Sequence, residues 1–146
     1  MNWKLSTLLI GLFSLGSNAQ TTESENIIKV LEKESATWRS GDSKAHASCW
    51  HIQPYSRILV STTDGKTYDV PAEEMVKISD AAGPGGSAIN TNYKMNINGN
   101  TAWVSHNEAS TAKDGVISYS YEIRLLEKIN NEWKLVGQSI HMYNKD

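Results

Sequence analysis

Most of the side chains that could do chemistry fall in strand-like segments of the second half of the sequence. They are one tyrosine, two histidines, two glutamates, one arginine and one serine: Tyr93, His106, Glu108, Glu122, Arg124, Ser139 and His141. A histidine beside a carboxylate can transfer protons, so His106 or His141 with Glu108 is a candidate catalytic pair. Arg124 could instead hold a ligand carboxylate through two parallel hydrogen bonds. The same charges could also form a solvent-facing patch or a satisfied salt-bridge network.

A second group, His46, Cys49 and His51, is a weak candidate for a metal site. On a helix His46 and Cys49 are neighbours, but His51 points elsewhere, and zinc sites need a fuller set of ligands. Packing of Cys49 and Trp50 in the core is the favoured interpretation. The sequence has neither the histidine spacing of a metalloprotease nor a glycine-rich phosphate loop. We therefore expect no metal and no cofactor.

The composition is typical of one globular domain. The chain has 146 residues, of which 39% are hydrophobic and 21% are charged, and such a length can bury a core without disulfides. Its single cysteine, Cys49, cannot form an internal disulfide. The formal net charge of −2 does not indicate nucleic acid or an anionic membrane as a partner.

The first nineteen residues have the pattern of a secretory signal peptide. Lys4 supplies the positive charge, residues 8–15 form an apolar run, and small residues precede a cleavage site after Ala19. An uncleaved anchor is the alternative, but the apolar run is short for a membrane span. We therefore expect residues 1–19 to be removed and residues 20–146 to form one domain. That domain would be exported to the periplasm or the extracellular space, with no membrane contact after cleavage.

The remaining pattern predicts helices first and an antiparallel sheet afterwards, which is the α+β class. Thr22 and Glu25 form a capping box at the start of a helix that ends at Gly41. The other expected elements are a short helix at 42–50, a hairpin turning at 64–65, a helix after 71, and strands at 88–97, 101–109, 116–128 and 132–143. The glycine-rich loop at 80–87 is expected to be a connector rather than a lid.

The turns between the four long strands predict which residues share a face. We expect two-residue turns at 98–99 and 130–131 and a three-residue loop at 113–115. These registers place four rungs on one face, which we call the inner face: Met95, Ala102, Leu126 and Leu135; Tyr93, Val104, Arg124 and Gly137; Thr91, His106, Glu122 and Ser139; Ile89, Glu108, Ser120 and His141. The outer face would then carry Trp103, Tyr121, Leu125, Ile140 and Met142. A shorter loop near 114 would separate His106 and Glu108 from Glu122 and Arg124.

The order of elements resembles the nuclear transport factor 2-like superfamily, in particular its secreted SnoaL-like and domain-of-unknown-function proteins. The motifs that carry the resemblance are Gly41-Asp42 after the first helix, Asn98-Gly99 before "TAWVS", Arg124 in "YEIRLLEK" and Trp133 in "EWKLV". The resemblance implies a cone in which a strongly bent sheet wraps around the helices and encloses a pocket. "SYEIRLLEKINNEWKLV" is also similar to the association domain of calmodulin-dependent kinase, where the matching arginine lines the pocket.

Members of this superfamily include isomerases, cyclases and dehydratases, and also binding or assembly domains without catalysis. The isomerases have a catalytic aspartate near the end of the second helix or on facing strands, but "CWHIQPYS" offers no carboxylate at the first of these places. An enzyme would have to use Glu108, Glu122 or a histidine.

We expect an exported domain that binds a small acidic or polar-aromatic molecule and forms a homodimer through the outer face. The alternatives are an isomerase-like or dehydratase-like enzyme that uses a His/Glu pair, and a protein-assembly module.

Overall fold

The computed structural model describes residues 15–145, so most of the predicted signal peptide lies outside the described residues. Its elements follow the chain in the order helices, hairpin, short helix and four long strands: α1 (Leu15–Ser40), α2 (Ser43–Ala47), β1 (Ile58–Ser61), β2 (Thr67–Val70), the 3-10 helix η1 (Ala72–Val76), β3 (Ser87–Asn98), β4 (Thr101–Thr111), β5 (Ile117–Ile129) and β6 (Glu132–Tyr143). The α+β class is as predicted.

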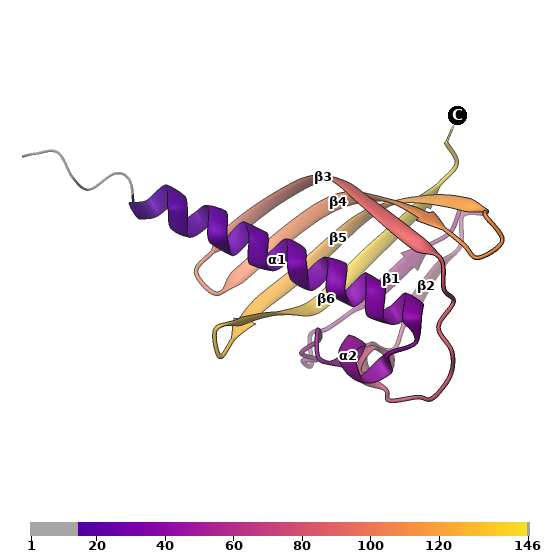
Figure 1. The fold of residues 1–146 in the computed structure, drawn as a ribbon, viewed down its shortest axis with the longest axis horizontal. Coiled ribbons are helices and arrows are strands. Elements are labelled where there is room, and N and C mark those ends of the chain that lie inside the picture. The colour runs from indigo at the N-terminus through magenta and orange to yellow at the C-terminus, as the bar shows by residue number, and fades with distance from the viewer. Residues whose placement is uncertain (1–14, 146) are drawn as a thin grey trace, which may run out of the picture.

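The strands form one open sheet with the order β2-β1-β6-β5-β4-β3. All neighbouring strands are antiparallel except β1 and β6, which are parallel. Helix α1 lies across one face of this sheet, and α2 follows at its C-terminal end (Figure 1). That covered face is the inner face of the sequence analysis. Among the described residues, no helix is both long and apolar enough to cross a membrane.

Helix α1 begins at Leu15, so the predicted start at the Thr22 capping box is wrong for this chain. No proline or glycine after Leu15 other than Gly16 interrupts the helical pattern, and Thr22 lies inside the helix. The helix ends where Gly41 adopts a φ of +79°, a conformation that glycine reaches without strain. Asp42 then caps α2, because its carboxylate accepts a hydrogen bond of 2.9 Å from the backbone nitrogen of Ala45.

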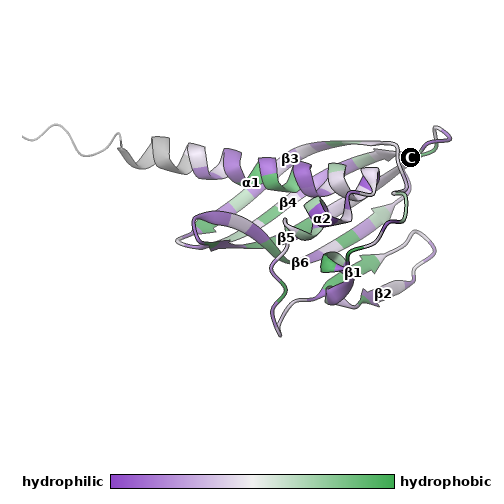
Figure 2. Ribbon diagram, turned by 60° about the horizontal axis from the view of Figure 1, so that its bottom comes forward, coloured by the Kyte–Doolittle hydropathy of each residue, from purple (hydrophilic) through white to green (hydrophobic). Residues whose placement is uncertain are grey.

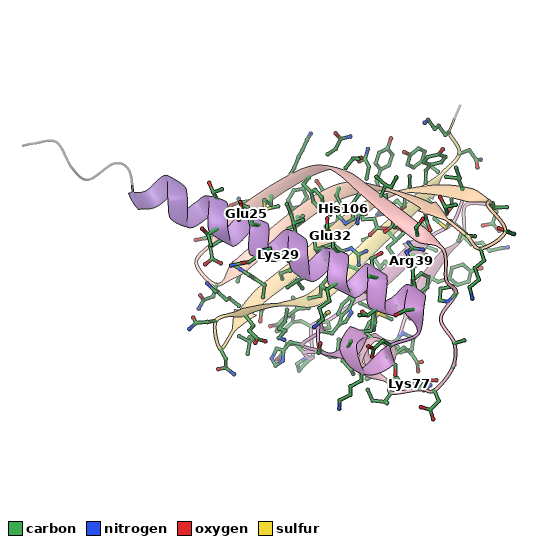
Figure 3. The ribbon with its side chains drawn as sticks, in the orientation of Figure 1. Glu25, Lys29, Glu32, Arg39, Lys77 and His106 are labelled. Carbon is green, nitrogen blue, oxygen red and sulfur yellow. The ribbon has the colours of Figure 1, made fainter. Side chains whose placement is uncertain are left out.

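The helix is amphipathic, with polar residues outward and a buried stripe toward the sheet. Glu25, Lys29 and Glu32 are exposed on its outer side (Figure 3). Ile27 and Leu31 are buried against the apolar end of the inner face. The strands complete this core with Ala102, Val104, Leu126, Trp133 and Leu135. Figure 2 shows hydrophobic and hydrophilic residues interspersed along these strands, as one-sided burial of a sheet requires.

The register between β4 and β5 is as predicted. The backbone nitrogen of Ala112 donates to Val116 over 2.9 Å, and Gly115 has a φ of +85° in the three-residue loop. His106 therefore pairs with Glu122, and the two strands bring their charged residues to the same face.

The register between β5 and β6 changes part of the way along the pair. Leu126 lies opposite Leu135 as predicted, but Leu125 lies opposite Gly137, so Val136 is an extra residue in β6. One extra residue turns every later side chain to the other face of the sheet. The prediction failed here because it assumed an unbroken two-residue alternation from the turn at 130–131 to the end of the strand.

This bulge corrects five predicted placements. Gly137 was predicted on the inner face opposite Arg124, but it pairs with Leu125 and so belongs to the outer face. Arg124 pairs with Gln138 and Glu122 with Ile140, so Gln138, Ile140 and Met142 face inward. Ser139 and His141 face outward, and the prediction that they lie inside is wrong. The prediction that Ile140 and Met142 belong to the outer face is wrong for the same reason.

A second irregularity lies in β3. The turn before β4 pairs Asn98 with Thr101, so the β3–β4 register differs by two residues from the predicted one. A shift of two residues leaves each side chain near the turn on its predicted face of the sheet. The pairing then shifts between Thr91 and Lys94, where Asn92 has a φ of +56°. Beyond this point Asn90 faces inward opposite Glu108, whereas Ile89 is 67% exposed. The predicted inward placement of Ile89 and Thr91 is therefore wrong.

Candidate functional site

A cavity of about 330 Å³ lies between the C-terminal half of α1 and the inner face. Its apolar lining comes from the helix, the hairpin, η1 and the ends of β5 and β6: Trp38, Ile58, Val60, Val70, Met75, Tyr119, Ile140 and Met142. Its polar lining comes from α1, α2, β4, β5 and β6: Glu34, Ser35, Arg39, His46, Glu108, Ser110, Ser118, Ser120, Glu122, Arg124 and Gln138. The cavity is thus apolar on one side and ionic on the other.

Arg124 is the central cation of the ionic side and is buried. Its guanidinium donates to Glu122 and to the side-chain oxygen of Gln138, and its Nη1 lies 3.6 Å from Oε2 of Glu34. Burial opposes the charge on Arg124, but Glu122 and Glu34 outweigh it and raise its pKa. Arg124 therefore joins a carboxylate on the sheet to a carboxylate on the helix.

Glu34 and His46 extend this arrangement to α2. Nε2 of His46 lies 3.0 Å from Oε1 of Glu34, and both side chains are buried. Burial alone would raise the pKa of Glu34, but the charge of Arg124 and the contact with His46 lower it. Because an ionised carboxylate only accepts hydrogen bonds, Nε2 of His46 carries a proton and donates it to Glu34 in this hydrogen bond.

Glu122 also contacts two buried residues of the strands, Ser120 and His106. Ser120 donates to Oε1 of Glu122 over 2.9 Å, and Nε2 of His106 lies 3.6 Å from Oε2. Neither ring nitrogen of His106 makes a hydrogen bond to the described residues. Burial lowers the pKa of His106, so its ring is neutral.

Tyr93 is half-buried and packs beside His106. Its ring lies 5.1 Å from that of His106, measured between centroids. Burial, with the charge of Glu32, raises the pKa of Tyr93 to about 12. Neither Tyr93 nor His106 reaches the cavity lining.

Arg39 and Glu108 form a separate ion pair at the cavity wall. Nη2 of Arg39 donates to Oε1 of Glu108 over 2.7 Å, and Nη1 donates to the hydroxyl of Ser110 over 2.9 Å. Burial and the nearby charge of Glu122 raise the pKa of Glu108 in spite of Arg39. Figure 3 shows Arg39 on the C-terminal part of α1 and His106 on the sheet beneath the same helix.

The structure places the seven predicted site residues in three different settings. Glu108, Glu122 and Arg124 line the cavity, while His106 is buried and Tyr93 half-buried behind them, beside a second hollow. Ser139 and His141 are on the outer face, where their side chains hydrogen-bond to each other over 2.8 Å. The predicted pair of His106 or His141 with Glu108 is therefore not assembled around the cavity.

Eight polar residues of the cavity lining were absent from the predicted ligand site: four serines (Ser35, Ser110, Ser118 and Ser120) and Glu34, Arg39, His46 and Gln138. The inward position of Glu34 could have been predicted from the sequence, because Glu34 continues the helical spacing of Ile27 and Leu31 on the buried stripe. Gln138 could not be found without the bulge at Val136. A carboxylate on a buried helical stripe is a useful sign that the helix covers a polar site.

The described residues contain no group of three or more histidine, cysteine, aspartate or glutamate side chains that could hold a metal ion. Cys49 is buried, and its sulfur contacts the carbonyl oxygen of Ala45 at 3.5 Å. Burial raises the pKa of the Cys49 thiol, which keeps it protonated and unreactive near neutral pH.

Comparison with known proteins finds relatives of the fold. No family model matches the chain, and no curated protein matches it. Among solved structures, a protein with a cystatin-like fold from Novosphingobium aromaticivorans has a TM-score of 0.67 at 14% identity and covers 95% of this chain and 94% of its own. A protein of unknown function from Shewanella baltica has a TM-score of 0.62 at 18% identity, covering 86% and 97%.

A third structure, from Cytophaga hutchinsonii, has a TM-score of 0.63 at 15% identity and covers 82% of this chain and 98% of its own. All three are described as nuclear transport factor 2-like proteins. At these identities the likeness concerns the fold. The chain therefore has the nuclear transport factor 2-like, cystatin-like fold that its motifs predicted.

Proposed function

We propose that this protein binds a small molecule with an apolar body and one polar group in the cavity beneath α1. The observation that carries the proposal is the division of the cavity lining into an apolar side and a buried ionic side. Small-molecule sites commonly have a volume above about 300 Å³, apolar walls and a few convergent polar groups. A module that served only assembly would have no need of an open volume next to buried charges.

The arrangement favours a ligand other than the simple acid that Arg124 alone suggested. Glu122, Glu34 and Gln138 already surround the Arg124 guanidinium. An incoming carboxylate would have to displace one of these partners and would stand beside the others, which repel it or compete with it. The polar-aromatic alternative of the sequence analysis meets no such obstacle.

Binding can be tested with N-phenyl-1-naphthylamine, a neutral aromatic probe whose fluorescence rises in apolar cavities. The wild type should give a saturable increase. Ile140→Trp, which fills the cavity from β6, should abolish it without unfolding the chain. Ile78→Trp makes the same change at an isoleucine that is 63% exposed and outside the lining, so it should bind like the wild type. Equal binding by all three proteins, or no saturable binding by the wild type, would refute the proposal.

A proton-transfer enzyme is the second candidate, and the Glu34–His46 pair favours it. A carboxylate that orients a histidine through one ring nitrogen is the arrangement found in general bases, in which the other nitrogen takes up a proton when the ring is neutral. A panel of cyclic ketones in heavy water tests this candidate, because a base beside the cavity would exchange the proton next to the carbonyl. Exchange observed by NMR with the wild type and lost in Glu34→Gln would support it. Exchange that persists in Glu34→Gln would count against this candidate.

Export is also proposed. It rests on Lys4, the apolar run at 8–15 and the small residues before Ala19. The intact mass of protein recovered from outside the cytoplasm of its host should correspond to a chain that starts at Gln20. Recovery with Met1 retained would contradict the proposal.

A further inference from the structure

We propose that the polar group of the ligand is a protonated amine that pairs with Glu108, an inference that rests on the proposed binding function. The cavity lining contains three glutamates, Glu34, Glu108 and Glu122, but only two arginines, Arg39 and Arg124. All five side chains are nine-tenths or more buried. Carboxylates therefore outnumber guanidinium groups in this lining, and the further titratable group there, His46, contacts Glu34 rather than Glu108.

Glu108 is the carboxylate of this lining with the fewest partners. Glu34 and Glu122 both contact Arg124, and each has a further partner, His46 for Glu34 and Ser120 for Glu122. Glu108 uses Oε1 for Arg39, while its Oε2 makes no hydrogen bond to the described residues. Oε2 is not among the enclosed atoms that lack a partner, so this oxygen is accessible and can accept a hydrogen bond from a ligand in the cavity.

The groups around Glu108 do not supply a donor to this oxygen. Arg39 divides its guanidinium between Glu108, Ser110 and Ser35. Glu122, which lies close enough to raise the pKa of Glu108, adds negative charge. The Nε of Arg124 has no partner, but it is fully enclosed and cannot reach a ligand in the cavity.

An ammonium group suits this site because it carries a positive charge that attracts the Glu108 carboxylate and offers three hydrogen-bond donors. One donor can go to Oε2 of Glu108, and the hydroxyl oxygens of Ser118 and Ser120 in the same lining can accept the others. The apolar body would then lie against Val70, Met75 and the inward side chains of β6. A neutral alcohol would supply one donor without the charge, and a carboxylate would supply neither.

Three probes that share one apolar body separate these cases: cyclohexylmethylamine, cyclohexylmethanol and cyclohexanecarboxylate. Each is titrated against the protein loaded with N-phenyl-1-naphthylamine, and displacement gives its affinity. The amine should bind about tenfold or more tightly than the alcohol, as expected for a hydrogen bond to a charged group. The carboxylate should bind most weakly.

Glu108→Gln keeps the size of the side chain and should remove most of the preference for the amine, with alcohol binding little changed. Glu74→Gln, the same change at an exposed glutamate outside the cavity, should keep the preference.

The ranking of the three probes on the wild type decides the inference even if Glu108→Gln fails to fold. Tightest binding by the carboxylate, or equal binding by amine and alcohol, overturns the inference while saturable binding of the aromatic probe leaves the proposed function standing. An amine preference that persists in a folded Glu108→Gln variant also overturns it, because the amine then has another partner. If neither the aromatic probe nor the amine binds, both the inference and the proposed function are wrong.

Discussion

The two ends of the inner face are formed by α1 and the same long strands, yet one end is a packed apolar core and the other surrounds a cavity with charged groups. At one end Ile27 and Leu31 of α1 pack on Val104, Leu126 and Leu135, all of which are less than 4% exposed. No charge enters this cluster. We call it the closed end.

At the other end, the open end, the next turns of α1 present Glu34 and Arg39 to Glu108, Glu122 and Arg124. This end surrounds a cavity instead of filling the space with side chains. Buried ion pairs contribute little net stability, because the loss of hydration offsets most of the attraction between the charges. The closed end therefore stabilises the fold, and the charged groups of the open end are those to which we assign the proposed binding.

The largest expected effect is that of Arg124→Ala. Removing the guanidinium leaves Glu122 and Glu34 buried without their cation, which should lower the free energy of unfolding by about 3–5 kcal/mol. Binding of N-phenyl-1-naphthylamine should be lost with it. Chemical denaturation and the fluorescence titration measure the two effects.

The control is Arg57→Ala, which breaks the exposed pair of Arg57 with Asp69. Such pairs contribute about 1 kcal/mol or less, so this variant should unfold and bind like the wild type within that margin. Equal stabilities for Arg124→Ala and Arg57→Ala would mean that the open end is solvated and that the contrast between the two ends is false.

The second prediction concerns the closed end. Leu135→Ala removes a side chain with no exposed surface and should lower the free energy of unfolding by about 2–5 kcal/mol. Because Leu135 does not line the cavity, the folded fraction should bind the aromatic probe with unchanged affinity. A loss of affinity in Leu135→Ala under conditions where the chain is folded would show that the two ends are coupled.

The contrast between the ends was visible in the sequence, but its exact lining was not. The turn at 113–115 fixed the β4–β5 register correctly, and this brought His106, Glu108, Glu122 and Arg124 to one face. The inserted residue Val136 leaves no signal in a hydrophobic strand, since Leu135 and Val136 suit either face equally well. The inward set of β6 is therefore Gln138, Ile140 and Met142 rather than Ser139 and His141.

The contribution of the helices was missed for another reason. Turn geometry says which strand residues share a face, but it does not say which helical residues lie above them. Arg39 reaches Glu108 only because α1 continues to Ser40 across the sheet and then ends at Gly41. The sequence predicted where the helix ends, but pairing Arg39 with Glu108 requires the position of the helix over the sheet.

The third prediction uses the pH dependence of stability that comes from His106, which is buried behind the open end, and from Glu108, which lines it. Burial depresses the pKa of His106, so the folded protein binds this proton less readily than the unfolded chain. The stability that comes from neutral His106 is present above the unfolded value of about 6.5 and is lost as the pH falls toward the depressed value. The slope from one such group is at most about 1.4 kcal/mol per pH unit.

Glu108 acts in the opposite direction, because its raised pKa gives stability at low pH that is lost as the pH rises through the raised value. The difference between wild type and His106→Gln isolates the histidine. His106→Gln should lose less stability than the wild type between pH 7 and pH 5, measured by denaturation at several pH values. His141→Gln, at an exposed histidine, should follow the wild type. If both variants lose stability as the wild type does, His106 is not buried in a neutral state.

The last prediction tests whether the outer face differs from both ends of the inner face. Trp103, Tyr121 and Leu125 are each more than 40% exposed there, and the ring of Tyr121 stacks on that of Tyr143 with 4.3 Å between centroids. Apolar groups gathered on one exposed face are typical of an interface. We expect a dimer by light scattering at micromolar concentration, and Tyr121→Glu should shift it toward the monomer. Within one protomer the change should alter stability by only about 0.5 kcal/mol. Tyr68→Glu, at an exposed tyrosine on β2, should remain dimeric. A monomeric wild type would contradict this prediction and leave the exposed rings of the outer face without a role in assembly, but the contrast between the open and closed ends would stand.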